Sequence, residues 1–308
     1  MVPAARGGSD VERVARHALG RADVAVQEQL AGLSNTAWPL VDGDGGRYVL
    51  KQGPLTSAAK WTSSHRALTL AGEAGIPVPE LRFAGEVDGS LVRVLTWIDG
   101  TPADQAPLGE AEVGRMIGSL GAAIGALHRR RVDGFSSRLD GSAPTFRRWA
   151  DYLEHRMRGI AGRCQEAGLD PALVDRVGTE VARLAGRVGG AAEPVVCHRD
   201  LHLGNLILAA DGSLAGIIDW DAAEPWDRAG DWFKLEYEVL RAHPDRADDL
   251  RSAYLDGGPV PAHWDERRRI VHLVEALNTL PNAVGRGWGD EFADRARRHL
   301  DALLTGSG

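Results

Sequence analysis

The sequence has little cysteine and no long apolar run, and each absence excludes a class of protein. Its two cysteines, Cys164 and Cys197, form no Cys-x-x-Cys pair among the 308 residues. That excludes a disulfide framework and a cysteine-based zinc motif. No stretch approaches the ~20 apolar residues that a membrane-spanning helix needs, and the opening MVPAARGGSD has no apolar signal region. We therefore expect a protein of the reducing cytoplasm, without a membrane partner.

The chain also lacks a basic excess. Its formal net charge is -7, whereas a nucleic-acid binder normally carries a basic stripe, so we expect no nucleic-acid partner. Lysine is scarce: the 36 basic residues comprise the three lysines Lys51, Lys60 and Lys234, and all the others are arginines. The position of each lysine in the sequence is therefore informative.

Length and pattern indicate two lobes. A chain of 308 residues, of which 44% are hydrophobic, is long for a single core. The first part predicts strands at Val24–Gln29, Ala37–Val41 and Arg47–Gln52, a helix over Ser57–Ala74, and two strands about a turn at Asp88–Gly89. From Thr101 onward apolar residues recur at helical spacing. Helices are expected there over Phe146–Glu166, Pro171–Val188, Trp232–Ala242, Asp245–Tyr254, Asp265–Leu280 and Glu291–Leu304.

These elements predict an α+β fold with an uneven division. We expect a disordered tail over residues 1–10 and a small, mainly β lobe with one prominent helix over 11–97. A hinge at 98–100 leads into a larger, mainly helical lobe over 101–308, because the strand pattern gives way to helix at Trp97-Ile98-Asp99-Gly100.

The stretch VVCHRDLHLGNLILAADGSLAGIIDWDAA, residues 195–223, combines apolar strands with polar groups that are costly to bury without a purpose. Two short strands, 206–209 and 214–218, flank Asp211-Gly212, a strong hairpin signal. Folding this hairpin brings Asn205 and Asp219 together. Amide and carboxylate oxygens suit Mg²⁺, so these two residues are the predicted metal ligands.

The loop before the hairpin matches a known catalytic pattern. HRDLHLGN, residues 198–205, agrees with the kinase loop H-R-D-L-x-x-x-N at every fixed position. In that mechanism the loop aspartate, here Asp200, receives or orients the attacking hydroxyl, while Asn and the later Asp hold the metals. Lys51, at the end of a predicted strand, stands where kinases place the lysine that contacts ATP phosphates.

Together these motifs resemble the aminoglycoside phosphotransferase and choline kinase family, small-molecule kinases with a bilobal, protein-kinase-like fold. The resemblance covers roughly residues 24–300 through GLSN, VLK, GIPVPE, LTWIDG, ALH, HRDLHLGN and IIDWD. It implies Asp200 as catalytic base, Mg²⁺ on Asn205 and Asp219, and ATP or GTP as the phosphate donor. The nucleotide contacts that it implies are Ser34, Asn35, Lys51, Thr96, Trp97 and Ile98. It also implies His198 as a brace of the loop and Asp231 as an acid that fixes it.

One departure from the family is clear. The family pairs its strand lysine with a glutamate on the first-lobe helix, and by spacing that acid belongs at or near Ser64. No Asp or Glu occurs between Lys51 and Glu73. We therefore expect no helix carboxylate on Lys51 and predict Asp219, or a nucleotide phosphate, as its main anionic partner.

Two other activities compete with small-molecule phosphorylation. A protein kinase needs a long activation segment ending in A-P-E, but here the chain passes from Asp219 almost directly into a predicted helix. A nucleotide-binding pseudokinase is favoured by the missing helix acid and opposed by the intact Asp200, Asn205 and Asp219. These three residues favour an active enzyme. We expect the protein to be either a monomer or a homodimer.

The acceptor is open at this point. An antibiotic or related natural product is the leading interpretation, because the family contains many resistance kinases. An amino alcohol such as choline is the alternative, since the second lobe is rich in tryptophan, which can cage a quaternary ammonium. Acids in the same lobe could bind a polyamine, although such charges are usually just solvated. The candidate acceptor contacts are His202, Asp221, Trp232 and Glu236.

Overall fold

The computed structural model describes residues 8–30, 36–286 and 290–306. Its chain divides into two compact units that are not contiguous in sequence. One comprises Met1–Ser119 with Leu203–Ala222, the other Leu120–His202 with Ala223–Gly308. The sequence alone suggested a single division at 98–100, and that hinge stays a prediction. The first helix, α1 (Gly8–Leu19), begins inside the expected N-terminal tail.

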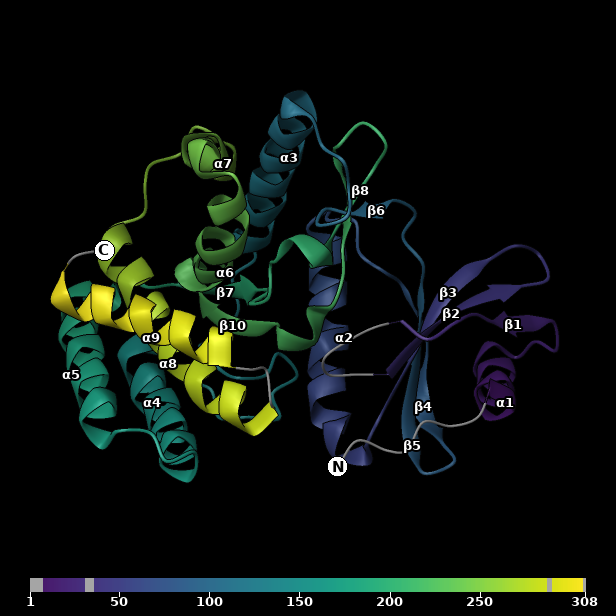
Figure 1. Ribbon diagram of the computed structural model, residues 1–308, viewed down its shortest axis with the longest axis horizontal. Coiled ribbons are helices and arrows are strands. Elements are labelled where there is room, and N and C mark those ends of the chain that lie inside the picture. Colours follow the sequence, from purple (N-terminus) through teal and green to yellow (C-terminus); the bar gives the residue numbers. More distant parts are fainter. Residues whose placement is uncertain (1–7, 31–35, 287–289, 307–308) are drawn as a thin grey trace. The chain divides into compact units, whose positions relative to one another are not determined.

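The first unit is built on a five-stranded antiparallel sheet with strand order β1-β2-β3-β5-β4 (Figure 1). Its strands are β1 (Val24–Val26), β2 (Thr36–Asp42), β3 (Arg47–Gly53), β4 (Leu81–Val87) and β5 (Ser90–Thr96). Asp88 and Gly89 both have positive φ, 51° and 71°, as a two-residue hairpin turn requires. Alternate residues of the central strands, Leu50, Val92 and Val94, are fully buried and share a core with α1.

The prominent helix of this unit is α2 (Ala58–Glu73). Its buried residues recur at helical spacing and include Trp61, Ser64 and Leu68, so one face of the helix packs inward. Gly75 follows with φ 80°, and prolines at 77 and 79 prevent a continuation. The expected helix over Ser57–Ala74 is confirmed to within a residue at each end.

A second, three-stranded sheet also belongs to the first unit, with order β6-β8-β9. It consists of β6 (Thr101–Pro102), β8 (Leu206–Leu208) and β9 (Leu214–Ile217). Backbone bonds tie the β8–β9 hairpin to the chain that follows α2: the Ile217 amide donates to the Pro77 carbonyl at 3.0 Å, and the Ala103 amide to the Leu206 carbonyl at 2.9 Å. β6 lies where only helix was expected, because it pairs with a strand about a hundred residues later.

The second unit is mainly helical. It contains the second half of α3 (Glu110–His128), followed by α4 (Trp149–Glu166), α5 (Pro171–Val188), α6 (Trp232–Lys234), α7 (Ala247–Leu255), α8 (Trp264–Arg286) and α9 (Asp290–Thr305). Helices α4, α5, α8 and α9 pack side by side (Figure 1) around buried residues such as Ile160, Val177 and Leu277. Within the described ranges, no helix is both long and apolar enough to cross a membrane.

Two short antiparallel strands, β7 (Pro194–Cys197) and β10 (Glu224–Asp227), complete the second unit. β10 was not expected, because a four-residue strand with a proline and two acids has no alternating pattern. The helix predicted over Trp232–Ala242 is confirmed: it runs as α6, then as a π-helical segment over Leu235–Leu240, and then as two further α-helical residues. A mainly β N-terminal part and a helical C-terminal part confirm the α+β class.

Candidate active site

Asn205 and Asp219 flank the β8–β9 hairpin on the same side. Leu206 pairs with Ile217 in the sheet, and the Ile218 amide donates to the Asn205 carbonyl at 3.0 Å. Asn205 is buried, while the Asp219 side chain is one-third exposed. Asp219 has φ 60°, a left-handed conformation that costs a non-glycine residue about 1–2 kcal/mol. The hairpin thus carries an amide and a carboxylate of the kind that Mg²⁺ prefers at one edge.

Lys51 reaches this edge from the five-stranded sheet. Its Nζ donates to Asp219 Oδ1 at 2.9 Å, and its side chain is only 14% exposed. The α2 helix offers no acid before Glu73. The predicted pairing of Lys51 with Asp219, in place of a helix glutamate, is therefore confirmed.

A second ion pair lies beside the first. Arg93 faces Lys51 in the β3–β5 register, and its Nη2 donates to both carboxylate oxygens of Asp221, at 2.5 and 2.6 Å. Ser64 of α2 donates to Asp221 Oδ1 at 3.0 Å and accepts from Arg93 Nη1 at 3.2 Å. Burial raises the pKa of Asp221, but Arg93 and Lys51 outweigh burial and hold that pKa below its ordinary value.

Sequence reasoning missed Arg93. The available signal was an arginine inside the otherwise apolar strand LVRVL, because a charge in a buried strand requires a partner. Asp221, predicted as an acceptor contact, has its carboxylate held by Arg93 and Ser64, with its side chain 8% exposed, and its role toward an acceptor stays a prediction.

The segment 198–200, which belongs to the predicted catalytic loop, follows β7 in the second unit and is fixed by Asp231. The Asp231 carboxylate accepts from the backbone amides of His198, at 3.1 Å, and Arg199, at 2.6 Å. It also bonds His128 Nε2, at the end of α3, at 2.9 Å. Burial by itself raises the pKa of Asp231, but its hydrogen bonds to His128 and to the Arg199 amide, together with the nearby histidines, outweigh burial and hold that pKa below its ordinary value. The predicted structural role of Asp231 is confirmed.

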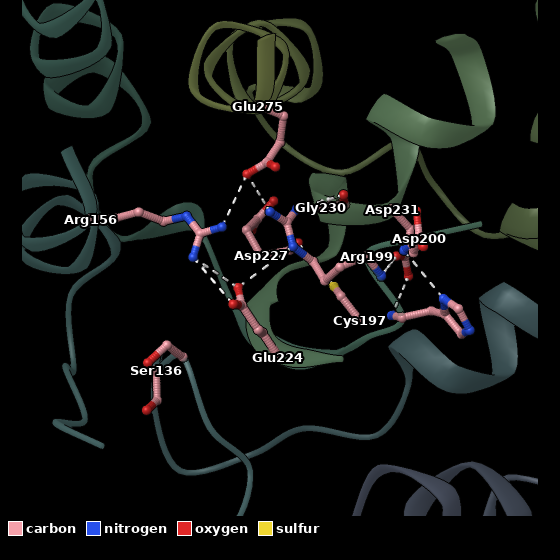
Figure 2. A network of polar contacts seen from close by, with 12 residues as sticks. Ser136, Arg156, Cys197, Arg199, Asp200, Glu224, Asp227, Gly230, Asp231 and Glu275 are labelled. Carbon is pink, nitrogen blue, oxygen red and sulfur yellow. Dashed lines mark hydrogen bonds and ion pairs between the residues drawn. The ribbon is translucent and has the colours of Figure 1, made fainter. Parts of the chain in front are cut away.

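A buried network of charges anchors the arginine of this loop (Figure 2). Arg199 Nη2 donates to Glu275 of α8 at 2.5 Å, and its Nη1 to the Gly230 carbonyl at 2.8 Å. Arg156 of α4 contacts both Glu275, at 3.3 Å, and Glu224 of β10, at 3.2 Å. Arg199 has φ 71°, so the network holds the loop in a conformation that is unfavourable by itself.

Asp200 emerges from this scaffold one-third exposed. Its backbone amide donates to His198 Nδ1 at 3.2 Å, which is consistent with the predicted bracing role of that histidine. Its carboxylate lies 3.3 Å from Lys234 Nζ of α6 and 3.9 Å from His202 Nε2. Lys234 was not predicted, although its rarity in the sequence was a signal. His202 lies against Asp200 and is half exposed.

The segment predicted to contact adenine runs through Thr96, Trp97 and Ile98. Thr96 Oγ1 accepts from the Glu80 amide at 2.8 Å, and the guanidinium of Arg47 stacks on the Trp97 ring at 4.5 Å. A Cβ at Gly216 would lie 2.4 Å from Ile98 Cδ1, so a larger residue at this position of β9 would require the Ile98 side chain to move. Ser34 and Asn35, the other predicted nucleotide contacts, lie outside the described residues.

The remaining two acceptor candidates are occupied by the protein itself. Trp232 is 3% exposed and packs edge-on against Tyr254 and Trp264. The Glu236 carboxylate accepts from Arg268 Nε at 2.6 Å and lies 3.0 Å from His272 Nε2. Their roles toward an acceptor stay predictions, because both side chains have structural partners.

Both fold and site define a kinase-like phosphotransferase, and comparison with known proteins agrees. Residues 26–270 match the Phosphotransferase enzyme family, so the chain belongs to that family and is a small-molecule kinase. It is 27% identical over 287 residues to streptomycin 3''-kinase of Streptomyces griseus, covering 86% of this chain and 97% of that protein. The resemblance to aminoglycoside phosphotransferases is confirmed.

Solved structures support the same fold. Aminoglycoside phosphotransferase APH(4)-Ia superposes with a TM-score of 0.77 at 19% identity, over 98% of this chain and 100% of that one. Macrolide 2'-phosphotransferase type I gives a TM-score of 0.61 at 20% identity, over 97% and 98% of the two chains. At these identities the likeness establishes the bilobal kinase-like fold, not the acceptor.

Proposed function

We propose that this enzyme transfers the γ-phosphate of ATP, or of GTP, to a hydroxyl of an aminoglycoside or a related natural product. The observation that carries the proposal is the Lys51–Asp219 ion pair at 2.9 Å on the hairpin edge that also holds Asn205. A lysine, a carboxylate and an amide at one edge are the groups that kinases use to hold a metal-bound triphosphate.

In this proposal the first unit binds the nucleotide. Lys51 contacts the α- and β-phosphates, the 96–98 segment lies against adenine, and Ser34 and Asn35 lie over the triphosphate. Asn205 and Asp219 hold Mg²⁺, and their oxygen donors fit that ion. The metal, when bound, neutralises the charge of the phosphates. A cytoplasmic location, where nucleotide and Mg²⁺ are available, belongs to the same proposal.

The second unit supplies the base. The oxygen of the acceptor hydroxyl bonds to the γ-phosphorus while Asp200 accepts the proton of that hydroxyl. The bond from the γ-phosphorus to the β,γ-bridging oxygen breaks and releases the nucleoside diphosphate. Asp231 fixes the loop backbone on one side of Asp200, and Lys234 and His202 lie beside its carboxylate. These contacts orient Asp200 before the substrates arrive, so little reorganisation remains for the reaction.

The acceptor class is supported by relatives. The curated relative described above is a streptomycin kinase, and APH(4)-Ia has been crystallised with ADP and hygromycin B. A protein assigned as a fructosamine-3-kinase from Thermobifida fusca shares the fold at 20% identity, so sugar-amine acceptors belong in any test. An aromatic cage for choline finds no support at Trp220, Trp226 or Trp232, which are all buried.

The proposal is tested with purified enzyme, Mg²⁺-ATP or Mg²⁺-GTP, and a panel of acceptors. Streptomycin, hygromycin B, a macrolide, a fructosamine and choline are each assayed for nucleotide consumption and for the mass of one added phosphoryl group. We expect an aminoglycoside to be phosphorylated. The Asp200→Asn variant should lose about 10²–10⁴-fold in turnover and still bind nucleotide. Absence of acceptor-dependent phosphorylation across the panel, or near-normal turnover of the variant, would refute the proposal.

A further inference from the structure

The part of α2 that precedes Glu73 carries no acid, and the charges next to Lys51 are arranged differently from the lysine–glutamate pairing typical of the family. At Ser64, where the sequence placed the missing glutamate, the helix presents a hydroxyl that bonds Asp221 at 3.0 Å. The positive partner of Asp221 is Arg93, on the strand beside Lys51. Arg93, Ser64 and Asp221 are nearly fully buried, at 1%, 2% and 8% exposure. We call these three residues the Arg93 clamp.

We propose that Arg93 is a positioning residue for the metal-binding Asp219: it holds Asp221, and so the turn that presents Asp219 to the phosphates. This inference rests on the proposed function, because it assigns Arg93 a part in binding the metal–nucleotide complex. It also removes Asp221 from the candidates for contact with the acceptor.

The backbone of the turn at Asp219 depends on its surroundings for its conformation. Asp219 has φ 60°, and such a conformation persists in a non-glycine residue only when its surroundings hold it. Two side chains that follow Asp219 provide that hold. Trp220 Nε1 donates to the Ile217 carbonyl at 2.9 Å, and Asp221 is gripped by Arg93 and Ser64. Loss of the clamp releases one of the two anchors next to Asp219.

The charges beside this turn form two separate ion pairs. Lys51 and Arg93 are opposite one another in register, so their side chains leave the sheet on the same face. Each of them forms an ion pair with one acid of the sequence Asp-Trp-Asp at 219–221: Lys51 pairs with Asp219, and Arg93 pairs with Asp221. Without Arg93, the buried Asp221 would compete for Lys51 and draw it away from Asp219 and the phosphates.

The test measures how much Mg²⁺ strengthens ADP binding, by calorimetric titration with Mg²⁺ and with chelator, below the unfolding temperature. We expect Arg93→Gln to reduce this Mg²⁺-dependent gain by about tenfold or more, equivalent to about 1.4 kcal/mol. Arg93→Lys keeps the positive charge but cannot contact Ser64 and Asp221 through two separate nitrogens as the guanidinium does. Its Mg²⁺-dependent gain should lie between those of the wild type and Arg93→Gln. The double variant Arg93→Gln/Asp221→Asn removes the competing acid and should recover part of the gain.

Two controls separate positioning from loss of stability. Leu68→Ala removes a buried apolar side chain from α2 and leaves all three clamp residues in place, and Arg82→Gln removes an exposed arginine from the adjoining strand β4. Both should keep the wild-type Mg²⁺-dependent gain, although Leu68→Ala lowers the unfolding temperature. An Arg93→Gln variant that keeps the same gain as Leu68→Ala would overturn the inference.

If Arg93→Gln does not fold, Arg93→Lys and Ser64→Ala carry the same measurement. A wild-type gain in both of them would overturn the inference. A wild-type enzyme that gains nothing from Mg²⁺ would instead contradict the proposed function, and the inference would fail with it. One set of titrations therefore distinguishes a failure of the inference about Arg93 from a failure of the proposed function.

Discussion

Replacing Glu275 by glutamine tests the buried network beneath the catalytic loop. Glu275 is the carboxylate that Arg199 and Arg156 share, at 2.5 and 3.3 Å, and glutamine is nearly its isostere without the charge. Removing one partner from a buried pair costs about 3–5 kcal/mol. The arginines lower the pKa of Glu275 to about 2 from an ordinary 4.5, against the effect of burial. At 1.36 kcal/mol per pKa unit this corresponds to about 3 kcal/mol.

The pH dependence follows from the direction of that shift. A carboxylate whose pKa is lowered by folding stabilises the native state above its unfolded pKa, and the stabilisation is lost as the pH falls through the folded value. The wild type should therefore exceed Glu275→Gln in stability at pH 7, and the difference should shrink between about pH 4.5 and pH 2. Urea unfolding at several pH values measures this difference directly.

The matched control is Glu154→Gln on α4, an exposed glutamate whose partner Arg158 lies one helical turn away. A surface pair of this kind contributes about 0–1 kcal/mol, so the control should be near neutral. Glu275→Gln should also reduce turnover, because Arg199 adjoins Asp200 in the loop. If Glu275→Gln matches Glu154→Gln in stability at pH 7, the network does not hold the loop as described.

Two further outcomes concern the nucleotide site. Activity should require Mg²⁺ or Mn²⁺ and disappear in Asp219→Ala, because that residue is the carboxylate paired with Lys51 beside Asn205; full activity in excess chelator would contradict this. Lys51→Ala should raise the nucleotide KM and lower kcat together, since it removes both positioning and charge stabilisation; unchanged steady-state kinetics would show that the lysine does not contact the phosphates.

Local sequence was sufficient for the elements whose signals lie within a few residues. The hairpin between β8 and β9 followed from Asp211-Gly212 and two apolar runs. Asn205 and Asp219 were expected to meet at its open end, and the structure pairs Asn205 with Ile218, the residue next to Asp219. The α2 helix followed from its spacing and from Gly75. Elements without such signals failed. β10 and β6 were missed because each is short and exists only through pairing with a distant strand.

What the sequence by itself determined is the chemistry: an aspartate in a kinase-type loop, a pair of metal-type ligands on a hairpin, and a strand lysine without a helix acid. What only the tertiary structure decided is which charge holds which. Arg93 and Asp221 are 128 residues apart, and Arg199 and Glu275 are 76 apart. The physical reason is that a buried charge is stable only beside an opposite charge. Packing decides which opposite charge lies near, and it joins residues so far apart in the chain that the sequence alone does not predict the contact.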